Sequence, residues 1–349
     1  MSTALFLSMR IAVDVMGGDH GCGVIIEGVR QALARYPQVS SIFLVGLEDD
    51  ITACLSTADR DSGRMEVVHA SQVLTMHDKP VDALRKKKDC SITRAIELVK
   101  EGRADALISP GNTGGILSAG TIRLRLLPGI SRGAIATVIP EPENEFVLLD
   151  SGANVECKPH HLAEFAIMGS IYSREVLGKA NPRVGVLSNG TEENKGNELT
   201  LEAHALLRRL DLNFVGNVEG HDLFHNKVDV VVCDGFVGNI VLKTCESMAR
   251  AMFGWLRTEL MRNPKRKMGA FLAKNAFRTL KTRLDAENYG GAPLLGLNGV
   301  VMKAHASASD RAIMNAIRTA VEAINHNLND AITRDMKYAA PILGGGEST

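Results

Sequence analysis

The sequence lacks the patterns that identify the common nucleotide-binding enzymes. No G-x-x-x-x-G-K segment occurs, which argues against a Walker A kinase or ATPase. After the first expected strand, Gly21-Cys22-Gly23 lacks the third glycine of the dinucleotide fingerprint G-x-G-x-x-G. These absences weaken the case for a kinase or an ordinary dehydrogenase, and they leave a metal-dependent dehydrogenase open.

The chain also has little that points to a membrane, an oxidising compartment or nucleic acid. Its six cysteines lie far apart without a C-x-x-C pair, which argues against a zinc site and a disulfide framework. No run of about 18 apolar residues occurs, so no membrane-spanning helix is expected. The 40 basic and 40 acidic residues cancel, so no overall charge favours nucleic acid as a partner. These properties favour a cytoplasmic protein.

The most informative stretch runs from Ala104 to Gly115. Residues 106–108 form a short apolar run typical of a buried strand, and Ser109-Pro110-Gly111 ends it. A helix is expected over residues 116–127. A glycine-rich loop before a helix presents backbone N–H groups and the positive end of the helix dipole, which together favour an anion such as phosphate.

Such loops recur after five expected strands, following Val15, Ile108, Leu149, Leu187 and Cys233. Taken singly, each glycine is explained by the tight turn that it permits. Parallel strands bring their carboxyl ends to one edge of a sheet, where ligands of such folds bind. The recurrence therefore predicts a binding site for an anion at that edge.

The order of the elements predicts an α/β fold in three layers, with a mostly parallel sheet and helices on both faces. Residues 9–341 are expected to form a single domain, and the ends, 1–8 and 342–349, to be disordered. Met1 and Met9 are both candidate starts. Strands are expected at 11–15, 42–45, 66–69, 106–108, 134–139, 145–149 (a hairpin with 134–139), 183–187, 228–233 and 300–303, and the main helices at 24–35, 91–101, 161–177, 198–210 and 310–324.

Four aspartates lie in or shortly after expected strands: Asp14, Asp19, Asp150 and Asp234. They are suited to cap the following helices, to bind a metal ion such as magnesium or to orient a ligand. Near the end of the chain, the period of a strand puts Lys303 and His305 on one face if the last expected strand continues past Lys303. A cation and an imidazole at the anion-binding edge are suited to hold phosphate and stabilise an oxyanion.

Residues 248–285 differ from the rest of the chain. Between Arg257 and Arg283, Glu259 is the only acidic residue, whereas basic residues are frequent and large apolar residues accompany them. The break at Asn263-Pro264 predicts two helices in a basic, amphipathic hairpin. The hairpin is explained by an exposed or dimer-forming arm, or by contact with anionic lipid or an acidic carrier protein. The contact residues are predicted to be Trp255, Leu256, Lys265, Arg266, Lys267 and Lys274.

Motifs along nearly the whole chain resemble those of the bacterial phosphate acyltransferase family known as PlsX. The matching segments are 13–19 (VDVMGGD), 87–91 (KKDCS), 109–114 (SPGNTG), 149–154 (LDSGAN) with Lys158-Pro159, 192–198 (EENKGNE), 234–239 (DGFVGN), 288–292 (NYGGA), and Lys303-Ala304-His305 with Ser309-Asp310. Their number and order make the resemblance much more specific than any single motif.

The resemblance implies a fold similar to isocitrate and isopropylmalate dehydrogenases, a homodimer and no metal or cofactor. The implied reaction converts acyl-[acyl-carrier protein] and inorganic phosphate to acyl phosphate, which feeds a membrane glycerol-3-phosphate acyltransferase of phospholipid synthesis. The protein would contact the inner face of the cell membrane. Lys303 and His305 are then the predicted catalytic residues. The predicted substrate-binding residues are Asp14, Gly17, Gly18, Asp19, Ser109, Gly111, Asn112, Thr113, Gly114, Asn154, Lys195, Asp234, Gly235, Gly238, Asn239, Ser309 and Asp310.

Three other functions stay open from the sequence. A metal-dependent dehydrogenase would reduce a nicotinamide cofactor with magnesium and a hydroxy acid. A transacetylase would use acetyl-coenzyme A as the acyl donor. A membrane-surface scaffold would bind vesicles without turnover.

Overall fold

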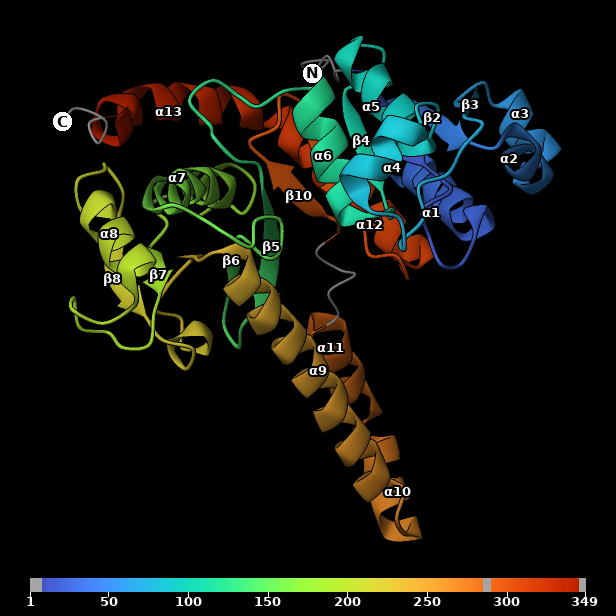
Figure 1. Cartoon of the computed structure of the whole chain (residues 1–349). Helices are drawn as coiled ribbons and strands as arrows, with labels where there is room; N and C mark the ends of the chain where they lie inside the picture. The colour runs from blue at the N-terminus through green and yellow to red at the C-terminus, as the bar shows by residue number, and fades with distance from the viewer. Residues whose placement is uncertain (1–7, 285–289, 345–349) are drawn as a thin grey trace, which may run out of the picture.

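The sheet at the centre of the protein has its strands in the order β3-β2-β1-β4-β11-β10-β5-β6-β9-β7-β8. The computed structural model describes residues 8–284 and 290–344. Figure 1 shows helices on both sides of the sheet and one group of helices leaving the body. The strands are β1 (Met9–Asp14), β2 (Val39–Gly46), β3 (Met65–His69), β4 (Ala106–Ser109), β5 (Ala134–Pro140), β6 (Glu145–Leu149), β7 (Val184–Leu187), β8 (Phe214–Val218), β9 (Val230–Val232), β10 (Ala292–Leu295) and β11 (Val300–Lys303). The predicted α/β fold with a large, mostly parallel sheet is confirmed.

Two parallel groups of strands meet through antiparallel pairs in the middle of the sheet. β3, β2, β1, β4 and β11 are parallel on one side, and β6, β9, β7 and β8 on the other. β10 joins the groups by antiparallel pairing with β11 and with β5, and β5 and β6 form the predicted hairpin. Most residues of the central strands are apolar because these strands are covered on both faces.

The helices cover this sheet and extend beyond it. Those of the first half are α1 (Cys22–Arg35), α2 (Glu48–Cys54), α3 (Thr57–Asp61), α4 (Pro80–Lys86), α5 (Ser91–Lys100) and α6 (Thr113–Arg123). The later ones are α7 (Pro159–Glu175), α8 (Glu198–Leu207), η1 (Asp222–Phe224), α9 (Gly235–Leu260), α10 (Pro264–Leu272), α11 (Lys274–Leu284), α12 (Asp310–Asn325) and α13 (Leu328–Leu343). Contacts between α1 and α12 are close because Gly28 has no side chain: a Cβ there would lie 2.4 Å from the backbone oxygen of Asp310.

Helix α7 is the most deeply buried helix of the second half. Its residues from His161 to Ser173 are all buried, and it packs against α8 and α13. Gly169 lets β9 approach, because a Cβ at this position would lie 2.6 Å from Cγ1 of Val230. The helix is apolar or small nearly all round, as expected of one enclosed on several sides.

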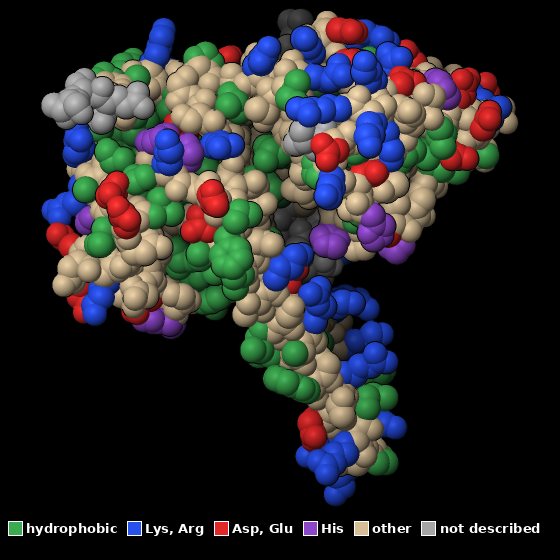
Figure 2. Space-filling model, in the orientation of Figure 1, with side chains coloured by type: hydrophobic (Ala, Val, Ile, Leu, Met, Phe, Trp, Pro, Cys, Tyr) green, Lys and Arg blue, Asp and Glu red, His purple; other side chains and the backbone are tan. Residues whose placement is uncertain are grey.

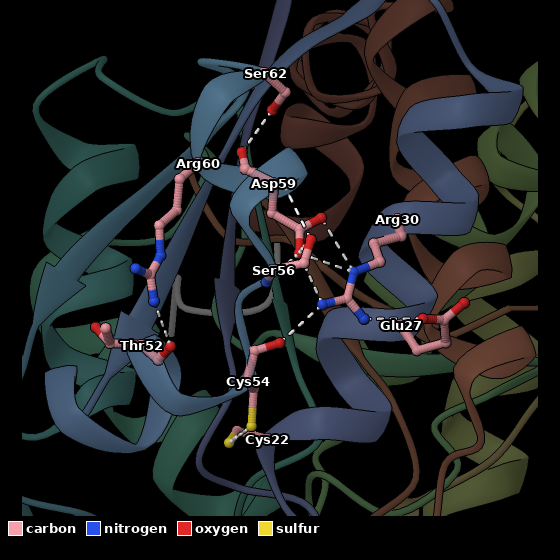
Figure 3. A network of polar contacts seen from close by, with 9 residues as sticks. All are labelled: Cys22, Glu27, Arg30, Thr52, Cys54, Ser56, Asp59, Arg60 and Ser62. Atoms are coloured by element: carbon pink, nitrogen blue, oxygen red, sulfur yellow. Dashed lines mark hydrogen bonds and ion pairs between the residues drawn. The ribbon is translucent and has the colours of Figure 1, made fainter.

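A network of polar contacts ties α2 and α3 to α1 (Figure 3). The Arg30 guanidinium donates to both carboxylate oxygens of Asp59 and, through Nη2, to the backbone oxygen of Cys54 at 2.8 Å. Asp59 also closes the capping box of α3 with Ser56. The Sγ atoms of Cys22 and Cys54 lie 3.1 Å apart. Charge and capping together fix these two short helices, which bury few apolar residues of their own.

Several elements differ from those predicted. Strand β8 was not predicted because Gly216 and Asn217 interrupt its apolar pattern. Strand β10 was not predicted either, and helix α13 continues through Leu343 into the segment expected to be disordered. The rest of the predicted disordered ends, residues 1–7 and 345–349, lies outside the described residues.

We define the arm as residues 235–284, which comprise α9, α10 and α11. Figure 1 shows it extending away from the body, and Figure 2 shows Lys and Arg side chains along it. Only Gly235 and Gly238 of these helices are buried. In the described part of the chain, no helix combines the length and apolar character needed to cross a membrane.

Candidate active site

The site is built where β1 and β4 end side by side. Asp14, the last residue of β1, is fully buried, and Ser109 at the end of β4 donates its hydroxyl to Asp14 Oδ2 at 2.7 Å. The backbone N–H of Met16 donates to Oδ1 at 3.1 Å. Burial raises the pKa of this carboxyl, and the hydrogen bonds and Lys303 oppose that rise. Asp14 therefore joins the two loops and does not face the solvent.

Two glycines allow those loops to touch through their backbones. A Cβ on Gly17 would lie 2.4 Å from the Cα of Gly111. Gly18 lies under the loop after β11, where a Cβ would be 3.5 Å from the oxygen of Ala306. The N–H of Asp19 donates to that same oxygen at 2.7 Å. These residues position the site through packing and backbone contacts.

The loop from Pro110 to Gly114 leads into helix α6. Asn112 caps this helix by accepting from the N–H of Gly115 at 3.0 Å, and the N–H of Gly111 donates to the hydroxyl of Ser109 at 3.1 Å. Among the described residues, no hydrogen-bond acceptor is seen for the amides of Asn112, Thr113 and Gly114. These three amides are therefore the candidate donors to a bound anion. The amide of Gly111 is not one of them, because it already donates to Ser109.

Lys303, the last residue of β11, brings a cation to this loop. Its Nζ donates to the backbone oxygen of Pro110 at 3.2 Å and also to that of Ala304. Burial lowers the pKa of Lys303 to about 8, although the charges of Asp14 and Asp19 act to raise it. At neutral pH the amine is mostly protonated, and its hydrogen bonds direct it toward the edge of the glycine loop.

His305 stands two residues further on, exposed at the mouth of the site. Its Nδ1 accepts from the N–H of Ser307 at 3.3 Å and lies 2.8 Å from the hydroxyl of the same residue. Burial on one side lowers the pKa of this imidazole, and the charges of Lys243 and Lys303 lower it further. These contacts assign the ring proton of the neutral form to Nε2, which is then a hydrogen-bond donor.

A second pair of loops closes the other side. Asp150, after β6, accepts hydrogen bonds from the backbone N–H groups of Ile135, Gly152, Ala153 and Asn154. Its pKa is raised by burial. The Asn154 side chain donates to Asp150 Oδ2 and to the backbone oxygen of Gly133, so it is engaged within the loop.

Helix α9 begins against this loop. Asp234 caps it by accepting from the N–H of Val237 at 2.8 Å. Gly235 and Gly238 let the helix approach, because a Cβ on Gly238 would lie 1.9 Å from the backbone oxygen of Asp150. Asn239 is exposed on the next turn, beside Gly152. The first turn of α9 is therefore held against the body while the rest of the helix leaves it.

A cleft with a volume of about 1060 Å³ lies between the body and the arm. Four of the predicted site residues line it, namely Thr113, Asn239, Lys303 and His305. The body also contributes hydroxyl groups, with Thr137 Oγ1 and Ser151 Oγ 2.6 Å apart. The cleft thus combines a cation, an imidazole, hydroxyls and the start of a helix.

Other predicted residues do not line the cleft. Lys195 is exposed in the loop beside β8, where its backbone oxygen accepts from Asn217. Ser309 caps α12, and Asp310 accepts from the side chain of Gln31 at 2.7 Å. For these residues the structure gives a local role, as a loop or helix-terminal group.

The basic residues of the first part of the arm were not predicted as site residues. Lys243, Arg250 and Arg257 line the cleft from α9, and Lys281 lines it from α11. Their seven-residue spacing in α9 is visible in the sequence. The predicted hairpin began at residue 248, and this boundary cut the pattern in two. A helix followed without interruption from Asp234 would have placed all three on one face.

Two further features bear on other chemistries. Gly129 to Gly133 has the spacing G-x-S-x-G, but the hydroxyl of Ser131 donates to Glu164 at 2.7 Å and the segment connects α6 to β5. It is therefore not a strand-to-helix nucleophile elbow. The described residues include one group with metal-ligand spacing, Glu219, His221 and Asp222, and it does not line the cleft.

The strand ends of this α/β fold carry a cation, amide donors and hydroxyls beside an open cleft. This arrangement is typical of a group-transfer enzyme that acts on an anionic substrate. Residues 9–331 match the sequence model of a family described as "Fatty acid synthesis protein". The chain is 49% identical to the phosphate acyltransferase of Heliobacterium modesticaldum, over 93% of this chain and 96% of that one. With the phosphate acyltransferase of Syntrophotalea carbinolica it shares 46% identity, over 95% of each.

The chain belongs to the phosphate acyltransferase family, and it is an acyltransferase enzyme of fatty acid and phospholipid synthesis. Solved structures show the same fold. A phosphotransacetylase from Streptococcus pyogenes matches with a TM-score of 0.58 at 18% identity, covering 91% of this chain and 94% of that one. A branched-chain phosphotransacylase from Enterococcus faecalis matches with a TM-score of 0.56 at 16% identity, covering 90% and 99%.

Proposed function

We propose that the cleft transfers the acyl group of an acyl-[acyl-carrier protein] thioester to inorganic phosphate. The observation that carries this proposal is the half-buried Lys303 ammonium, which donates to the backbone oxygen of Pro110 in the glycine loop and lies two residues before His305. A phosphate oxygen attacks the thioester carbonyl carbon, the C–S bond breaks, and acyl phosphate and the carrier thiolate leave. A thiol of pKa roughly 8.5 is a good leaving group, so the enzyme needs no covalent nucleophile.

Phosphate is held between Lys303 and the start of α6. The amides of Asn112, Thr113 and Gly114 and the dipole of α6 complete an anion cradle, which Asp14 supports from below through Ser109. Gly17 and Gly111 let the loops after β1 and β4 approach closely enough for this arrangement. Binding in this position orients the phosphate for attack, which is a large part of the catalysis that such a site supplies.

His305 stabilises the negative charge that develops on the carbonyl oxygen. Because Nδ1 accepts from Ser307, Nε2 carries the proton of the neutral ring and donates it to the oxyanion. The lowered pKa favours the neutral imidazole, which suits this role. Asp19, Asn154 and the segment 234–239 shape the surrounding loops.

The reaction is tested by incubating the protein with a long-chain acyl-[acyl-carrier protein] and inorganic phosphate and trapping acyl phosphate with hydroxylamine. Acyl hydroxamate that depends on phosphate supports the proposal, and a parallel reaction with acyl-coenzyme A identifies the donor. His305→Ala should lower kcat about 100-fold with little change in the KM for phosphate. Absence of product from both donors would overturn the proposed reaction, and equal turnover of acetyl-coenzyme A in a third reaction would favour a transacetylase.

The arm is proposed to contact the anionic surface of a membrane as a basic, amphipathic hairpin. Its support is the exposure of large apolar side chains among cations: Trp255 is 64% exposed, and Phe271 and Leu272 are 70% and 77% exposed. Leu256, Lys265, Arg266, Lys267 and Lys274 are also exposed on α9, α10 and α11. Apolar side chains enter the headgroup region while the cations pair with lipid phosphates.

Charge reversal tests the membrane contact. A variant with Lys265→Glu, Arg266→Glu and Lys267→Glu should bind vesicles of anionic lipid at least about tenfold more weakly, since each cation near such a surface contributes about 1 kcal/mol. Vesicles of neutral lipid provide the control. Unchanged binding to anionic vesicles together with a higher KM for acyl-[acyl-carrier protein] would assign the cations to the carrier protein and overturn the membrane proposal.

The cellular setting follows from the product. Acyl phosphate is a reactive mixed anhydride, so rapid transfer to a nearby acceptor enzyme limits its loss. We propose that this acceptor is a membrane glycerol-3-phosphate acyltransferase. The enzyme is proposed to be a cytoplasmic homodimer without metal or cofactor, peripheral to the inner face of the cell membrane. Its architecture is proposed to be related to isocitrate and isopropylmalate dehydrogenases.

A further inference from the structure

A stripe of cations continues the catalytic cleft along the inner side of the arm. Lys243, Arg250 and Arg257 recur every seven residues on α9, and Lys281 lines the same cleft from α11. Residues seven apart lie on nearly the same side of a helix, two turns apart. The stripe is distinct from the basic residues of α10, none of which lines the cleft.

The inner end of this stripe lies at the reaction centre. The charge of Lys243 contributes to the lowered pKa of both Lys303 and His305, after the larger effect of burial. Glu246 partly offsets this end, because its carboxylate lies 3.3 Å from Nζ of Lys243 and 4.0 Å from Nη2 of Arg250. In residues 8–284 and 290–344, neither Arg257 nor Lys281 takes part in an ion pair. Positive charge therefore dominates the outer end.

The spacing of the cations sets the size of the ligand. With a rise of 1.5 Å per residue, Arg250 lies about 10 Å and Arg257 about 21 Å beyond Lys243 along the helix axis. The prosthetic group of an acyl-carrier protein has about thirteen bonds between its thioester sulfur and its phosphodiester. At the extended reach of a peptide, about 3.4 Å for every three bonds, this thread spans roughly 15 Å. The phosphodiester then falls between Arg250 and Arg257.

The residues along the stripe suit the binding of a pantetheine chain. Leu242, Ala249 and Phe253 lie beside the cations in the lining of the cleft, and Leu284 lies across from them on α11. This alternation suits a ligand with a methylated, partly apolar chain and a single charged group at its far end. A free phosphate ion is polar on all sides, so it would gain nothing from the apolar side chains beside the cations.

Building on the proposed acyl transfer, the geometry points to a binding site for the phosphodiester of the donor's pantetheine arm, formed by Arg250 and Arg257 of α9 and Lys281 of α11. The thread runs from this site along the inner face of α9 to place its thioester beside His305. The arm is thus one wall of the active site. Acyl-carrier protein and acyl-coenzyme A both present this phosphate, so the site recognises their shared chemistry.

Binding of two unreactive probes tests this site without depending on turnover. S-methyl 4′-phosphopantetheine and S-methyl pantetheine differ only in the phosphate, and calorimetry gives their Kd values for the full-length protein. Wild-type protein should bind the phosphorylated probe at least about tenfold more tightly. Arg250→Ala combined with Arg257→Ala should reduce this ratio to about one, whereas Arg278→Ala, an exposed α11 cation outside the cleft lining, should retain it.

The possible outcomes distinguish a failure of the phosphodiester site from a failure of the proposed reaction. Equal binding of the two probes by wild-type protein, or a ratio that survives in the double variant, would overturn the phosphodiester site. A retained ratio with a loss of binding to anionic vesicles would assign the stripe to lipid. If the probes discriminate as expected but no acyl phosphate forms from any donor, the site stands and the proposed reaction fails.

Discussion

Helices α7 and α9 are the two longest helices of the described part of the chain, and they differ sharply in burial. α7 has 17 residues, of which an unbroken run from His161 to Ser173 is buried. α9 has 26 residues and buries only Gly235 and Gly238. Both carry large apolar side chains. The comparison shows that apolar character supports folding in α7 and is available for contact with other molecules in α9.

The active site lies where these two kinds of structure meet. On the body side, Asp14, Ser109 and Asp150 are buried and bonded within their loops. On the arm side, Lys243 and Arg250 project from an exposed helix. The body therefore fixes the reacting groups, and the arm offers a surface to a large substrate. Substitutions in the two regions should have separable effects.

The largest effect on stability is expected in α7. Phe165→Ala removes a fully buried ring, and the free energy of unfolding should fall by about 3–5 kcal/mol because the space that it leaves is filled only in part. Urea unfolding followed by circular dichroism measures this change. A loss below about 1 kcal/mol would show that α7 is not packed as described.

The next effect is on catalysis. Lys303→Ala removes the cation beside the glycine loop, and kcat/KM for phosphate should fall about 100- to 1000-fold, as for the loss of one preorganised charge-stabilising group. Lys303→Arg serves as the matched control, because it keeps the charge and changes only the shape of the donor. Equal losses in both variants would point to a role in packing, and no loss in either would remove Lys303 from the site.

The pH dependence sharpens this prediction. Because the pKa of Lys303 is lowered to about 8, phosphate binding should weaken above pH 8, by up to about tenfold per pH unit. The contribution of Lys303 to the stability of the folded protein, in contrast, increases over this pH range. The folded protein holds the proton less tightly than the unfolded chain, so stability rises as the pH increases from about 8 to the unfolded value near 10.4.

The KM for phosphate, measured from pH 6 to 10 with the unfolding midpoint followed in parallel, distinguishes these trends. Loss of affinity without loss of folded protein supports titration of Lys303. The Lys303→Arg variant should show no such rise in KM, because its guanidinium stays protonated throughout. A wild-type KM that is flat across pH 8 would contradict the assignment.

Much of the body could be predicted from the sequence because its signals are local. Strands β1, β4, β6 and β9 are short, mostly apolar runs with Gly or Asp soon after their ends, and their alternation with helices favours a mostly parallel sheet. Lys303 and Thr113 were found at the cleft because strand ends gather at one edge. The position of β10 between β11 and β5 could not be predicted, since pairing between distant strands depends on the whole sheet.

The roles of individual site residues were harder to predict. Asp14, Asp150 and Asn154 have the residue types of ligand-binding groups, but their side chains satisfy buried backbone and hydroxyl groups of their own loops. Which partner a carboxylate takes depends on distances that no pattern of residues reports. The cations of α9 were missed for a different reason, because the helix was divided at an arbitrary boundary.

The smallest effect on stability is expected at Trp255 of α9, whose side chain is 64% exposed. Trp255→Ala should change the free energy of unfolding by less than about 0.5 kcal/mol, as is usual for an exposed surface position. The same variant should weaken binding to anionic vesicles, because a large apolar side chain no longer enters the headgroup region. A loss of stability approaching that of Phe165→Ala would mean that Trp255 is covered in solution. In that case the arm would pack against a partner. The contrast between an exposed α9 and a buried α7 would then hold for the isolated chain only.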